Sequence, residues 1–415
     1  MSPDYRPSSD RPRREFLTKC GIGLVTALST ATAGCTSDLP PLGSQQRYGR
    51  VAVPPADAPE YRQWIPSPAT LDAPVEQYYF GVLRPKDIPL DAPELVVARR
   101  AHAKTDLDYF GIGFENYDRL VTSSVGTVVE ANFDRATVRQ TITDSGYERS
   151  GEHRGYAVFS RSDVPRRVAV GDGVVVWTSE YRHAAPNLEA LIDAGKGERP
   201  RYHEENAAVE RLTSKAGGNA YLGVSTAIRG PADRPVMRAD AFRFDDDTAY
   251  QVIHYLYEKT RVPTKSVLKS ALKREEYRFA DEADGFDVQF DGRLATVETR
   301  VPLRSTDRLD PEYQLPQVTW GTTYDRETES VTIRHEAGES VPAGRLFYDV
   351  DRPSRPGRID ERQLWTGTDT VAGGAETTID LNGHPNATDV NLVYSTGGVS
   401  FHVLFGLDLR GDADE

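Results

Sequence analysis

The sequence predicts an α+β protein that ends in an all-β domain, and three observations carry this prediction. Helical and strand-like patterns alternate between residues 75 and 308. Within this region the order strand, helix, hairpin occurs at 127–179 and again at 249–301. Over residues 309–415 the helical period disappears, and short apolar runs alternate with turns rich in Gly, Asp and Asn. Such runs with regular turn signals are typical of a β-sandwich.

The first unit begins with a Val-rich strand at Thr127–Phe133. Asp134 is expected to cap a short helix that buries Val138 and Ile142, which lie one turn apart. The segment Arg167–Ser179 places a Gly-Asp-Gly turn between two Val-rich arms, which predicts a hairpin. Two further helices are expected downstream, near residues 187–194 and 204–215.

The second unit has the same order of elements. Ala249–Glu258 has the pattern of a strand, Pro263–Lys273 that of a helix, and Gly285–Val301 that of a hairpin. We therefore expect a duplicated unit, with copies at about 75–200 and 201–308, in which a sheet carries helices on one face. Because the identity between the copies is low, two unrelated α+β segments remain an open alternative.

The C-terminal region carries a resemblance to a known group of proteins. The segment Val331–Val350, followed by "AETTIDL" and "VNLVYSTGGVSFHVL", resembles the β-rich domain of archaeal pilin-like secreted proteins. The resemblance implies an Ig-like sandwich for residues 309–415. The chain lacks the long apolar helix by which pilins assemble, so a shared module is expected rather than a filament subunit.

The N-terminus has the pattern of an export signal. Arg13 and Arg14 are followed by Phe16 and Leu17 in the segment "RREFL". The apolar stretch Cys20–Ala33 is 14 residues long, which is shorter than the roughly 20 residues that a membrane-spanning helix needs. A charged front, a short apolar middle and small residues before a cleavage site are typical of a secretory signal.

The paired arginines resemble the twin-arginine export signal, and the segment "TAGC", which ends at Cys35, resembles a lipobox. Residues 1–35 are thus a predicted signal peptide, with Cys35 lipidated and becoming the first mature residue. The whole chain resembles a family of haloarchaeal lipoproteins, which implies a location on the outer face of the cytoplasmic membrane. The alternative is a disordered basic N-terminus with a chance cysteine.

The cysteine count and the charge exclude several classes of function. Cys20 and Cys35 are the two cysteines of the chain, so the predicted mature body has no disulfide, no cysteine nucleophile and no cysteine metal site. The formal net charge is −13, and removing residues 1–35 would make it about −15. An acidic surface argues against nucleic-acid binding, which needs a basic face.

Residues 36–74 are rich in Pro, Ser, Asp and Ala, which predicts an extended and poorly packed tether. Tyr61–Pro66 is an aromatic island within this segment. It either docks on the folded body or lies at the membrane interface. The expected task of the tether is to hold the body away from the lipid surface.

Two glycine-containing segments partly match catalytic or cofactor motifs. Gly223–Ala227 resembles a nucleophile elbow, but its last position is Ala and the segment has the pattern of a continuous strand. Gly111–Gly113 is a fragment of a dinucleotide-binding loop, without the third glycine or a following helix. A strand and a turn are therefore the favoured interpretations, and no catalytic residue or cofactor is predicted.

The histidines and acidic clusters predict no metal site. His203-Glu204-Glu205 is the densest cluster, and a polar helix N-terminus explains it better than a ligand set. Asp245-Asp246-Asp247 lacks the spacing and glycine of a calcium loop, which favours a solvated turn. His254 and His402 lie in apolar strands, where core or pore-facing positions are expected.

One triplet marks a candidate modification site. Asn386-Ala387-Thr388 fits the acceptor pattern for N-glycosylation and lies between two expected strands. Such triplets also arise by chance, so both interpretations stay open.

Three functions follow as hypotheses. The leading one is a lipid-anchored, non-enzymatic binding or structural module of the archaeal envelope, with the membrane and other envelope proteins as partners. The second is an exported hydrolase whose site is assembled from distant residues, which predicts a deep pocket with converging His, Asp or Glu side chains. The third is a solute-binding lipoprotein, which predicts two lobes that face each other across a cleft.

Overall fold

The computed structural model describes residues 51–72, 75, 77–180, 182–183, 185–228, 234–274, 283, 285–304, 309, 313–351, 362–384, 386–396 and 401–409. The predicted export-signal residues Arg13, Arg14, Phe16 and Leu17 and the predicted lipidation residue Cys35 lie outside these ranges. Among the described residues, no helix has the length and apolar character needed to cross a membrane.

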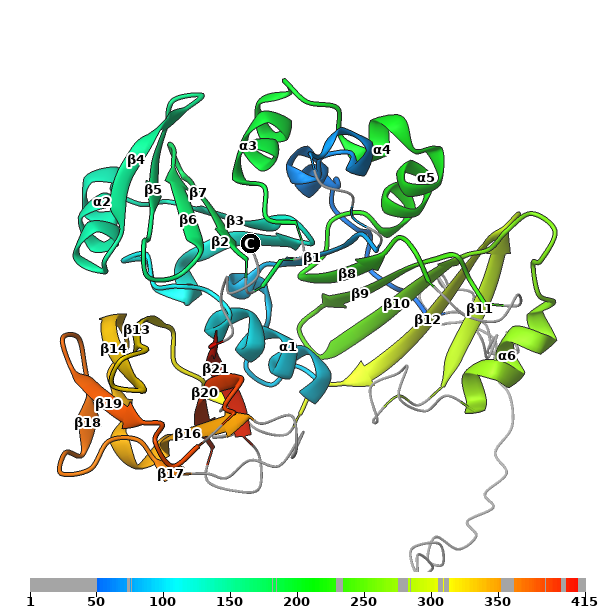
Figure 1. Cartoon of the computed structure of the whole chain (residues 1–415). Coiled ribbons are helices and arrows are strands. Elements are labelled where there is room, and N and C mark those ends of the chain that lie inside the picture. The colour runs from blue at the N-terminus through cyan, green and yellow to red at the C-terminus, as the bar shows by residue number, and fades with distance from the viewer. Residues whose placement is uncertain are drawn as a thin grey trace, which may run out of the picture. The chain divides into compact units, whose positions relative to one another are not determined.

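Twelve of the described strands form one antiparallel sheet, which runs from β11 at the right of Figure 1 to β4 at the left. Its order is β11-β12-β10-β9-β8-β1-β2-β3-β7-β6-β5-β4. The strands are β1 (Tyr79–Leu83), β2 (Tyr117–Ser123), β3 (Gly126–Ala131), β4 (Glu148–His153), β5 (Tyr156–Ser160), β6 (Arg166–Val170), β7 (Val174–Ser179), β8 (Tyr221–Ser225), β9 (Met237–Phe244), β10 (Thr248–Leu256), β11 (Phe286–Asp291) and β12 (Leu294–Pro302).

The predicted α+β class is confirmed. The described α-helices are α1 (Glu94–Thr105), α2 (Arg135–Asp144), α3 (Leu188–Lys196), α4 (Tyr202–Glu205), α5 (Ala207–Ala216) and α6 (Lys265–Arg274). Asp134 caps α2 as expected, because its carboxylate accepts a hydrogen bond from the Thr137 backbone N–H at 2.7 Å. The single helix expected at 204–215 is instead divided at Asn206, whose side chain caps α5.

The two predicted units meet at the centre of the sheet, where β1 pairs antiparallel with β8 and Gly81 lies opposite Gly223. We call β2, β3, β7, β6, β5 and β4 the first arm, and β9, β10, β12 and β11 the second arm. In each arm the strand before the helix pairs with the last strand after it, as β3 with β7 and β10 with β12. Both units therefore belong to one continuous sheet.

The first face of the sheet is covered by α1, α2 and α6. Val138 and Ile142 of α2 lie in one apolar cluster with Val129 and Trp177 of the first arm. Leu268 and Leu272 of α6 lie in a smaller cluster with residues of the second arm, Ile253, Tyr255, Val288, Ala295 and Val297. Because side chains alternate along a strand, the register places these strand residues on the same face.

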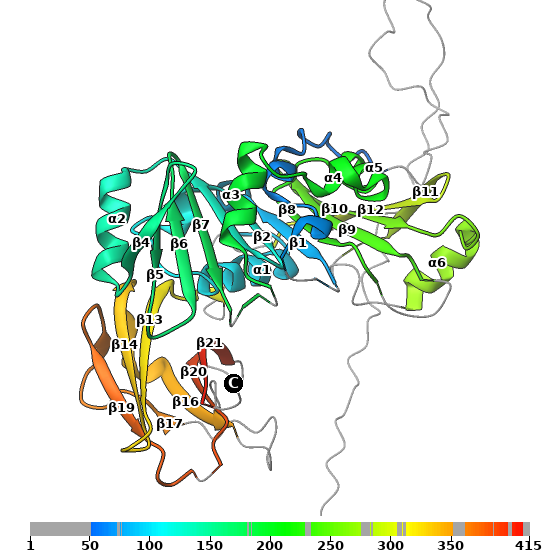
Figure 2. The ribbon, with the colours of Figure 1, turned by 45° about the horizontal axis from the view of Figure 1, so that its top comes forward.

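The second face carries α3 and α5, whose Leu191 and Leu212 pack with Val128 and Leu222 of the strands. Figure 2 shows α3, α4 and α5 on the side of the sheet away from α1. The expectation of helices on one face is therefore wrong. Strands such as β3 and β7 are buried at nearly every position, and a sheet that is apolar on both faces needs cover on both.

Residues 313–409 form further antiparallel sheets, consistent with the β-rich prediction. The sheets are β13-β14-β19, β15-β18 and β17-β16-β20-β21. Apolar residues of the two larger sheets, among them Ile333 and Leu392, belong to one cluster. The strands are β13 (Val318–Asp325), β14 (Ser330–Gly338), β15 (Val341–Pro342), β16 (Leu346–Asp351), β17 (Arg362–Gln363), β18 (Thr370–Val371), β19 (Glu376–Asp380), β20 (Asp389–Ser395) and β21 (Phe401–Asp408).

The C-terminal sheets are joined to the first arm through a buried polar contact. Arg166 on β6 donates to the Asp108 carboxylate at 2.5 Å, and both side chains are less than a tenth exposed. Arg166 also donates to the Trp320 carbonyl at 3.3 Å. Gln317 donates from its side-chain amide to the Asp108 carbonyl at 3.1 Å. Trp177 and Trp320 belong to the same apolar cluster, so the two regions share a core.

The described part of the expected tether, residues 51–72, packs on the body. Tyr61, Trp64 and Ile65 are 1%, 5% and 2% exposed. The Trp64 indole N–H donates to the Glu130 carboxylate at 2.7 Å, and its ring lies against Gly195 of α3, where a Cβ would come within 2.0 Å of it. The island thus docks on the second face, because burying its aromatic surface outweighs the polar composition around it.

Candidate functional site

A cavity of about 470 Å³ lies between α1 and the first face of the sheet, where β1 meets β8. Small-molecule sites typically have volumes of about 300–1,000 Å³. The helix contributes Arg99, His102 and Asp106, which follow a helical spacing along one side of α1. We call this cavity the central pocket; its other lining residues are Tyr79, Gly81, Val82, Leu83, Ala103, Leu107, Leu120, Thr122, Thr127, Trp177, Arg182, His183 and Tyr221.

The floor of the central pocket contains a glycine that the backbone does not require. Gly81 does not have a positive φ, and a Cβ built on it would meet its nearest neighbour, the Leu222 carbonyl oxygen, at an ordinary 3.5 Å. A glycine inside a strand weakens the strand and often marks close approach of a ligand. Gly223 lies directly opposite, and a Cβ there would be 3.1 Å from the Tyr221 hydroxyl. The open space therefore lies over Gly81, while the Tyr221 side chain occupies the space over Gly223.

The charged lining groups leave the pocket with an excess of positive charge. Arg182 forms an ion pair with Asp106, with 2.7 Å between its Nη1 and the carboxylate oxygen, and donates from Nη2 to the Leu404 carbonyl at 3.4 Å. Arg99 forms neither an ion pair nor a hydrogen bond within the part of the chain that the structure describes, and it is exposed. Two guanidinium groups therefore face one carboxylate.

The charge of Arg99 acts on the pKa of a carboxyl group beside the pocket, that of Asp240. Asp240 on β9 is opposite Gly223 and 18% exposed, and it binds Arg238 at 2.5 Å. Burial raises the pKa of Asp240, while Arg238, Gln251 and Arg99 act in the opposite direction. Burial likewise raises the pKa of the Tyr221 hydroxyl. This carboxyl group is thus already paired with Arg238, and Arg99 has no ion pair of its own among the described residues.

The two histidines of the pocket are held by other groups. His183 is 5% exposed, its Nδ1 lies 3.1 Å from the Ser179 carbonyl oxygen, and burial lowers its pKa to about 4, so the ring is neutral at pH 7. The Nε2 of His102 lies 3.2 Å from Nδ1 of His402 on β21. His402 therefore lies at the contact with α1.

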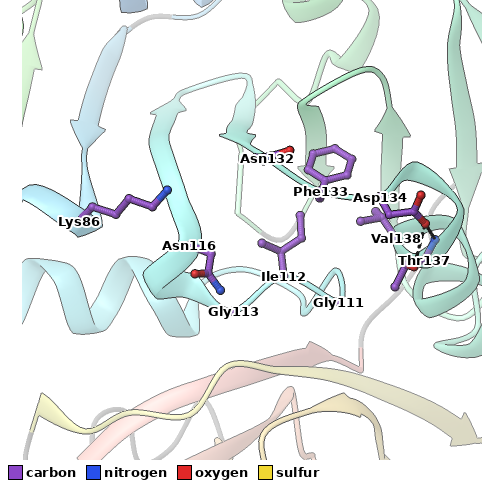
Figure 3. Close-up of a pocket in the computed structure, with 10 residues that line it drawn as sticks. All are labelled: Lys86, Gly111, Ile112, Gly113, Asn116, Asn132, Phe133, Asp134, Thr137 and Val138. Carbon is purple, nitrogen blue, oxygen red and sulfur yellow. Dashed lines mark hydrogen bonds between the residues drawn. The ribbon is translucent and has the colours of Figure 1, made fainter.

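A second cavity of about 410 Å³ is lined by residues that precede α2 and by the segment Gly111–Gly113 (Figure 3). Its charged groups are engaged within the protein. The Asp134 carboxylate points back to Thr137 and occupies the helix N-terminus, and Lys86 binds Asp118 at 2.6 Å. A phosphate at this helix would meet a carboxylate, so the dinucleotide-loop interpretation is disfavoured here.

The other sequence candidates have structural roles. Of the segment Gly223–Ala227, expected inside a continuous strand, Gly223–Ser225 forms the end of β8, and Thr226 and Ala227 follow the strand. Glu204 accepts a hydrogen bond from the Arg201 backbone at the start of α4, at 2.9 Å. Asp245 accepts from Tyr250 and from the Asp247 backbone in the turn between β9 and β10.

The remaining candidates lie apart from the central pocket. His254 is a core residue, 2% exposed, with Nδ1 3.0 Å from the Thr296 hydroxyl. Asn386 is exposed and has φ 68° between β19 and β20. Within the described ranges, no group of three or more His, Cys, Asp or Glu side chains is placed to hold a metal ion.

Sequence reasoning did not predict the central pocket, although one signal was present. Tyr79-Phe80-Gly81-Val82 and Tyr221-Leu222-Gly223-Val224 have the same Tyr-x-Gly-Val pattern. The pattern marks the two strands that pair at the centre of the sheet. Arg99 and Arg182 carry no such signal, because only the fold brings α1 and the end of β7 to the same cavity.

Comparisons with known proteins give no family for this chain. No family model and no curated protein matches it. Among solved structures, the chain is similar to crystal form III of TP0453, at 8% sequence identity. The alignment covers 57% of this chain and 94% of that one, with a TM-score of 0.34. A likeness of this size carries no argument about function.

Proposed function

We propose that this chain is a lipid-anchored, non-enzymatic protein of the cell surface whose folded body binds a small ligand in the central pocket. The observation that carries the binding role is the floor of that pocket, where the residue is Gly81 although neither backbone geometry nor crowding requires glycine. A larger residue would strengthen the strand and fill the space. The open space is therefore best explained by an occupant.

The lining favours an organic anion with an apolar part as the ligand. Leu83, Leu107, Leu120 and Trp177 supply apolar walls, and Arg99 supplies a cation without an ion pair among the described residues. A guanidinium group binds carboxylate or phosphate through paired N–H donors. The protein as a whole has a net charge of −13 and repels anions. An arginine in the pocket without an ion pair among the described residues therefore favours binding of a carboxylate or phosphate at this place.

The anchoring role rests on the sequence. Arg13, Arg14, Phe16 and Leu17 provide the export pattern, and Cys35 provides the acceptor for the lipid. On this proposal the protein is exported by the twin-arginine route and held at the outer face of the cytoplasmic membrane. Other envelope proteins are proposed partners, and N-glycosylation at Asn386 is proposed as a modification of its exposed turn.

The two alternatives receive less support from the pocket. A hydrolase would need a base free to act on a nucleophile, whereas Asp106 is paired with Arg182 and His183 lies against the backbone of Ser179. A transporter receptor would present two lobes across a cleft, whereas both halves here contribute to one sheet through β1 and β8. Binding on the face of the sheet therefore stays the leading proposal.

Two finer features of the fold belong to the same proposal. The repeated Tyr-x-Gly-Val pattern and the equivalent pairings of β3 with β7 and β10 with β12 support a duplicated unit, with copies at about 75–200 and 201–308. For residues 309–415, the shared apolar cluster of the two larger sheets supports an Ig-like sandwich.

The binding role is tested by filling the floor of the pocket. Thermal unfolding is measured with decanoate, phenyl phosphate and the neutral analogue decanol, for the native chain and for Gly81→Val. A ligand at about 100 times its Kd adds about 2.7 kcal/mol of stability, so Tm should rise with the anions in the native chain and not in the variant. The matched control is Gly151→Val on β4, where a Cβ also meets open space. Equal shifts in all three proteins would contradict the pocket assignment.

The anchoring role is tested separately. Cys35→Ser should release the protein into the medium, because the sulfur that accepts the lipid is lost. Mass spectrometry of the native chain should find an acylated Cys35 at its N-terminus. A cytosolic chain that keeps Met1 and carries no lipid would refute the anchor.

A further inference from the structure

The segment around α6 differs in charge from the rest of the molecule. Between Glu258 and the pair Glu275-Glu276, residues 259–274 contain six basic residues and no acidic residue, in a chain with 63 acidic and 50 basic residues. Four of the nine lysines of the chain lie in this segment, namely Lys259, Lys265, Lys269 and Lys273. The rest of the protein is correspondingly more acidic than the whole.

The fold turns these charges to the surface. Leu268 and Leu272 are 5% and 2% exposed and hold α6 against the second arm. At 100° per residue, Lys269 and Lys273 lie on one flank of the outward side of the helix and Val267 on the other. Val267 is 57% exposed, which is unusual for a valine.

Three of these cations have no carboxylate partner among the residues that the structure describes. Lys265 lies 3.7 Å from the Asp287 carboxylate, and Arg261 lies 3.4 Å from that of Glu258. Lys259, Lys269 and Lys273 form no ion pair with any described residue. In contrast, several basic residues elsewhere in the described structure, such as Arg84 and Arg161, have a carboxylate partner. The charge on α6 is therefore available to an external anionic surface.

We infer that the outward side of α6, with Lys269, Lys273 and the exposed Val267, forms together with Lys259 of the preceding turn a contact surface for an anionic membrane. The inference rests on the proposed lipid anchor, since a single acyl chain binds a membrane only marginally and needs a second signal such as a basic patch. Lysine side chains suit this task because their apolar stems cover the interface while the ammonium groups stay at the headgroups.

The chain path makes the contact possible. Cys35 and the first described residue, Val51, are separated by residues 36–50, which span at most about 50 Å when fully extended. The chain then enters the body at the second arm, where the Pro54 carbonyl accepts a hydrogen bond from Arg243 of β9 at 2.6 Å. The second arm also carries α6. The acidic remainder of the body would be repelled by the same surface, which selects one orientation.

The test is sedimentation of the Cys35→Ser chain, which cannot be acylated, with vesicles of phosphatidylcholine alone or of equal parts phosphatidylcholine and phosphatidylglycerol. At about 0.1 M salt, where the Debye length is about 10 Å, the anionic vesicles should bind the chain more tightly. Each basic group near such a surface contributes about 1 kcal/mol. The further changes Lys259→Gln, Lys269→Gln and Lys273→Gln together should therefore weaken binding about 100-fold.

The matched control removes three lysines elsewhere, by Lys86→Gln, Lys196→Gln and Lys215→Gln, and thermal unfolding checks that both triple variants are folded. Equal weakening in the control would overturn the inference, because net charge would then explain the result. Failure of the Cys35→Ser chain to bind anionic vesicles would also overturn it and leave an acidic partner protein as the occupant of α6. Since no lipid is attached in this experiment, either failure leaves the acylation of Cys35 untouched.

Discussion

The two arms of the sheet have the same order of elements, but they differ in how much of the protein packs on their first face. In the first arm, α2 packs beside α1 and the C-terminal sheets, and their apolar side chains join one large cluster. In the second arm, α6 covers the same face over a smaller cluster, which has eight buried residues among those described, while Phe242 of β9 joins the large cluster. The same strand-helix-hairpin order thus occurs once with a large apolar core and once with a small one. The difference is that α1 and the C-terminal sheets pack beside α2 and add their apolar side chains to its core.

The arms differ in their polar contacts as well. The first arm contains Arg161 and Arg166, both less than a tenth exposed, which bind Glu336 and Asp108 and link the arm to the C-terminal sheets. In the second arm, the pair of Lys265 with Asp287 has a lysine that is 53% exposed. The first arm thus forms buried ion pairs with other parts of the protein, whereas the ion pair at the helix of the second arm has an exposed lysine. This contrast can be tested by substitutions in pairs, one in each arm.

The largest effect is expected from the buried ion pair. Asp108→Ala leaves Arg166 without its carboxylate in the core, and breaking a buried pair costs about 3–5 kcal/mol. Asp287→Ala removes the partner of an exposed lysine and should cost at most about 1 kcal/mol. Urea unfolding of both variants measures the difference. Equal losses would show that the contact between the first arm and the C-terminal sheets is not buried in solution.

A smaller difference is expected between the helices. Ile142→Ala in α2 and Leu272→Ala in α6 both remove buried side chains, 0% and 2% exposed, and each should cost about 2–5 kcal/mol where it acts. The loss at Ile142 should appear in global unfolding, because α2 belongs to the large cluster. At Leu272, hydrogen exchange should show local opening of α6 with a smaller global loss. Uniform exchange over both helices in the two variants would remove the distinction.

The smallest effect is a dependence on pH that both arms share. Burial lowers the pKa of His183 to about 4 and that of His254 to about 3, from an ordinary value of 6.5. The unfolded chain then binds more protons below pH 6.5, so stability falls as the pH decreases. Each histidine should contribute about 2 kcal/mol of this loss at pH 5.

Substitution separates the two contributions. His183→Asn and His254→Asn should each reduce the difference in unfolding free energy between pH 7 and pH 5 by about 2 kcal/mol. If NMR of the folded protein showed either imidazole titrating near pH 6.5, that histidine would be hydrated in the native state. It would then contribute nothing to the pH dependence of stability, and the prediction for that residue would be wrong.

Local patterns in the sequence predicted local structure well. Asp134 caps α2, the Gly-Asp-Gly segment turns between β6 and β7, and the apolar pairs Val138 with Ile142 and Leu268 with Leu272 face the sheet. Such features depend on a few neighbouring residues, so a short window contains them. Docking of the island Tyr61–Pro66 was one of two expectations, but the poorly packed tether predicted for residues 36–74 is wrong for its described part, 51–72. Composition did not show this, because Trp64 packs against Gly195 of α3, far along the chain.

By itself, the sequence determined the α+β class, the order strand, helix, hairpin over 127–179 and 249–301, and the acidic charge of the chain, since these follow from spacing, caps and composition. Residues 1–35 also contain the predicted export and lipidation signal. The sequence did not predict α1, which lines the central pocket. Only the tertiary structure decided that both faces of the sheet are covered, that Gly81 meets Gly223 at its centre, and that Arg99 and Arg182 line one cavity. These features arise from pairing and packing between segments far apart in the chain, and no local pattern records which segments will meet.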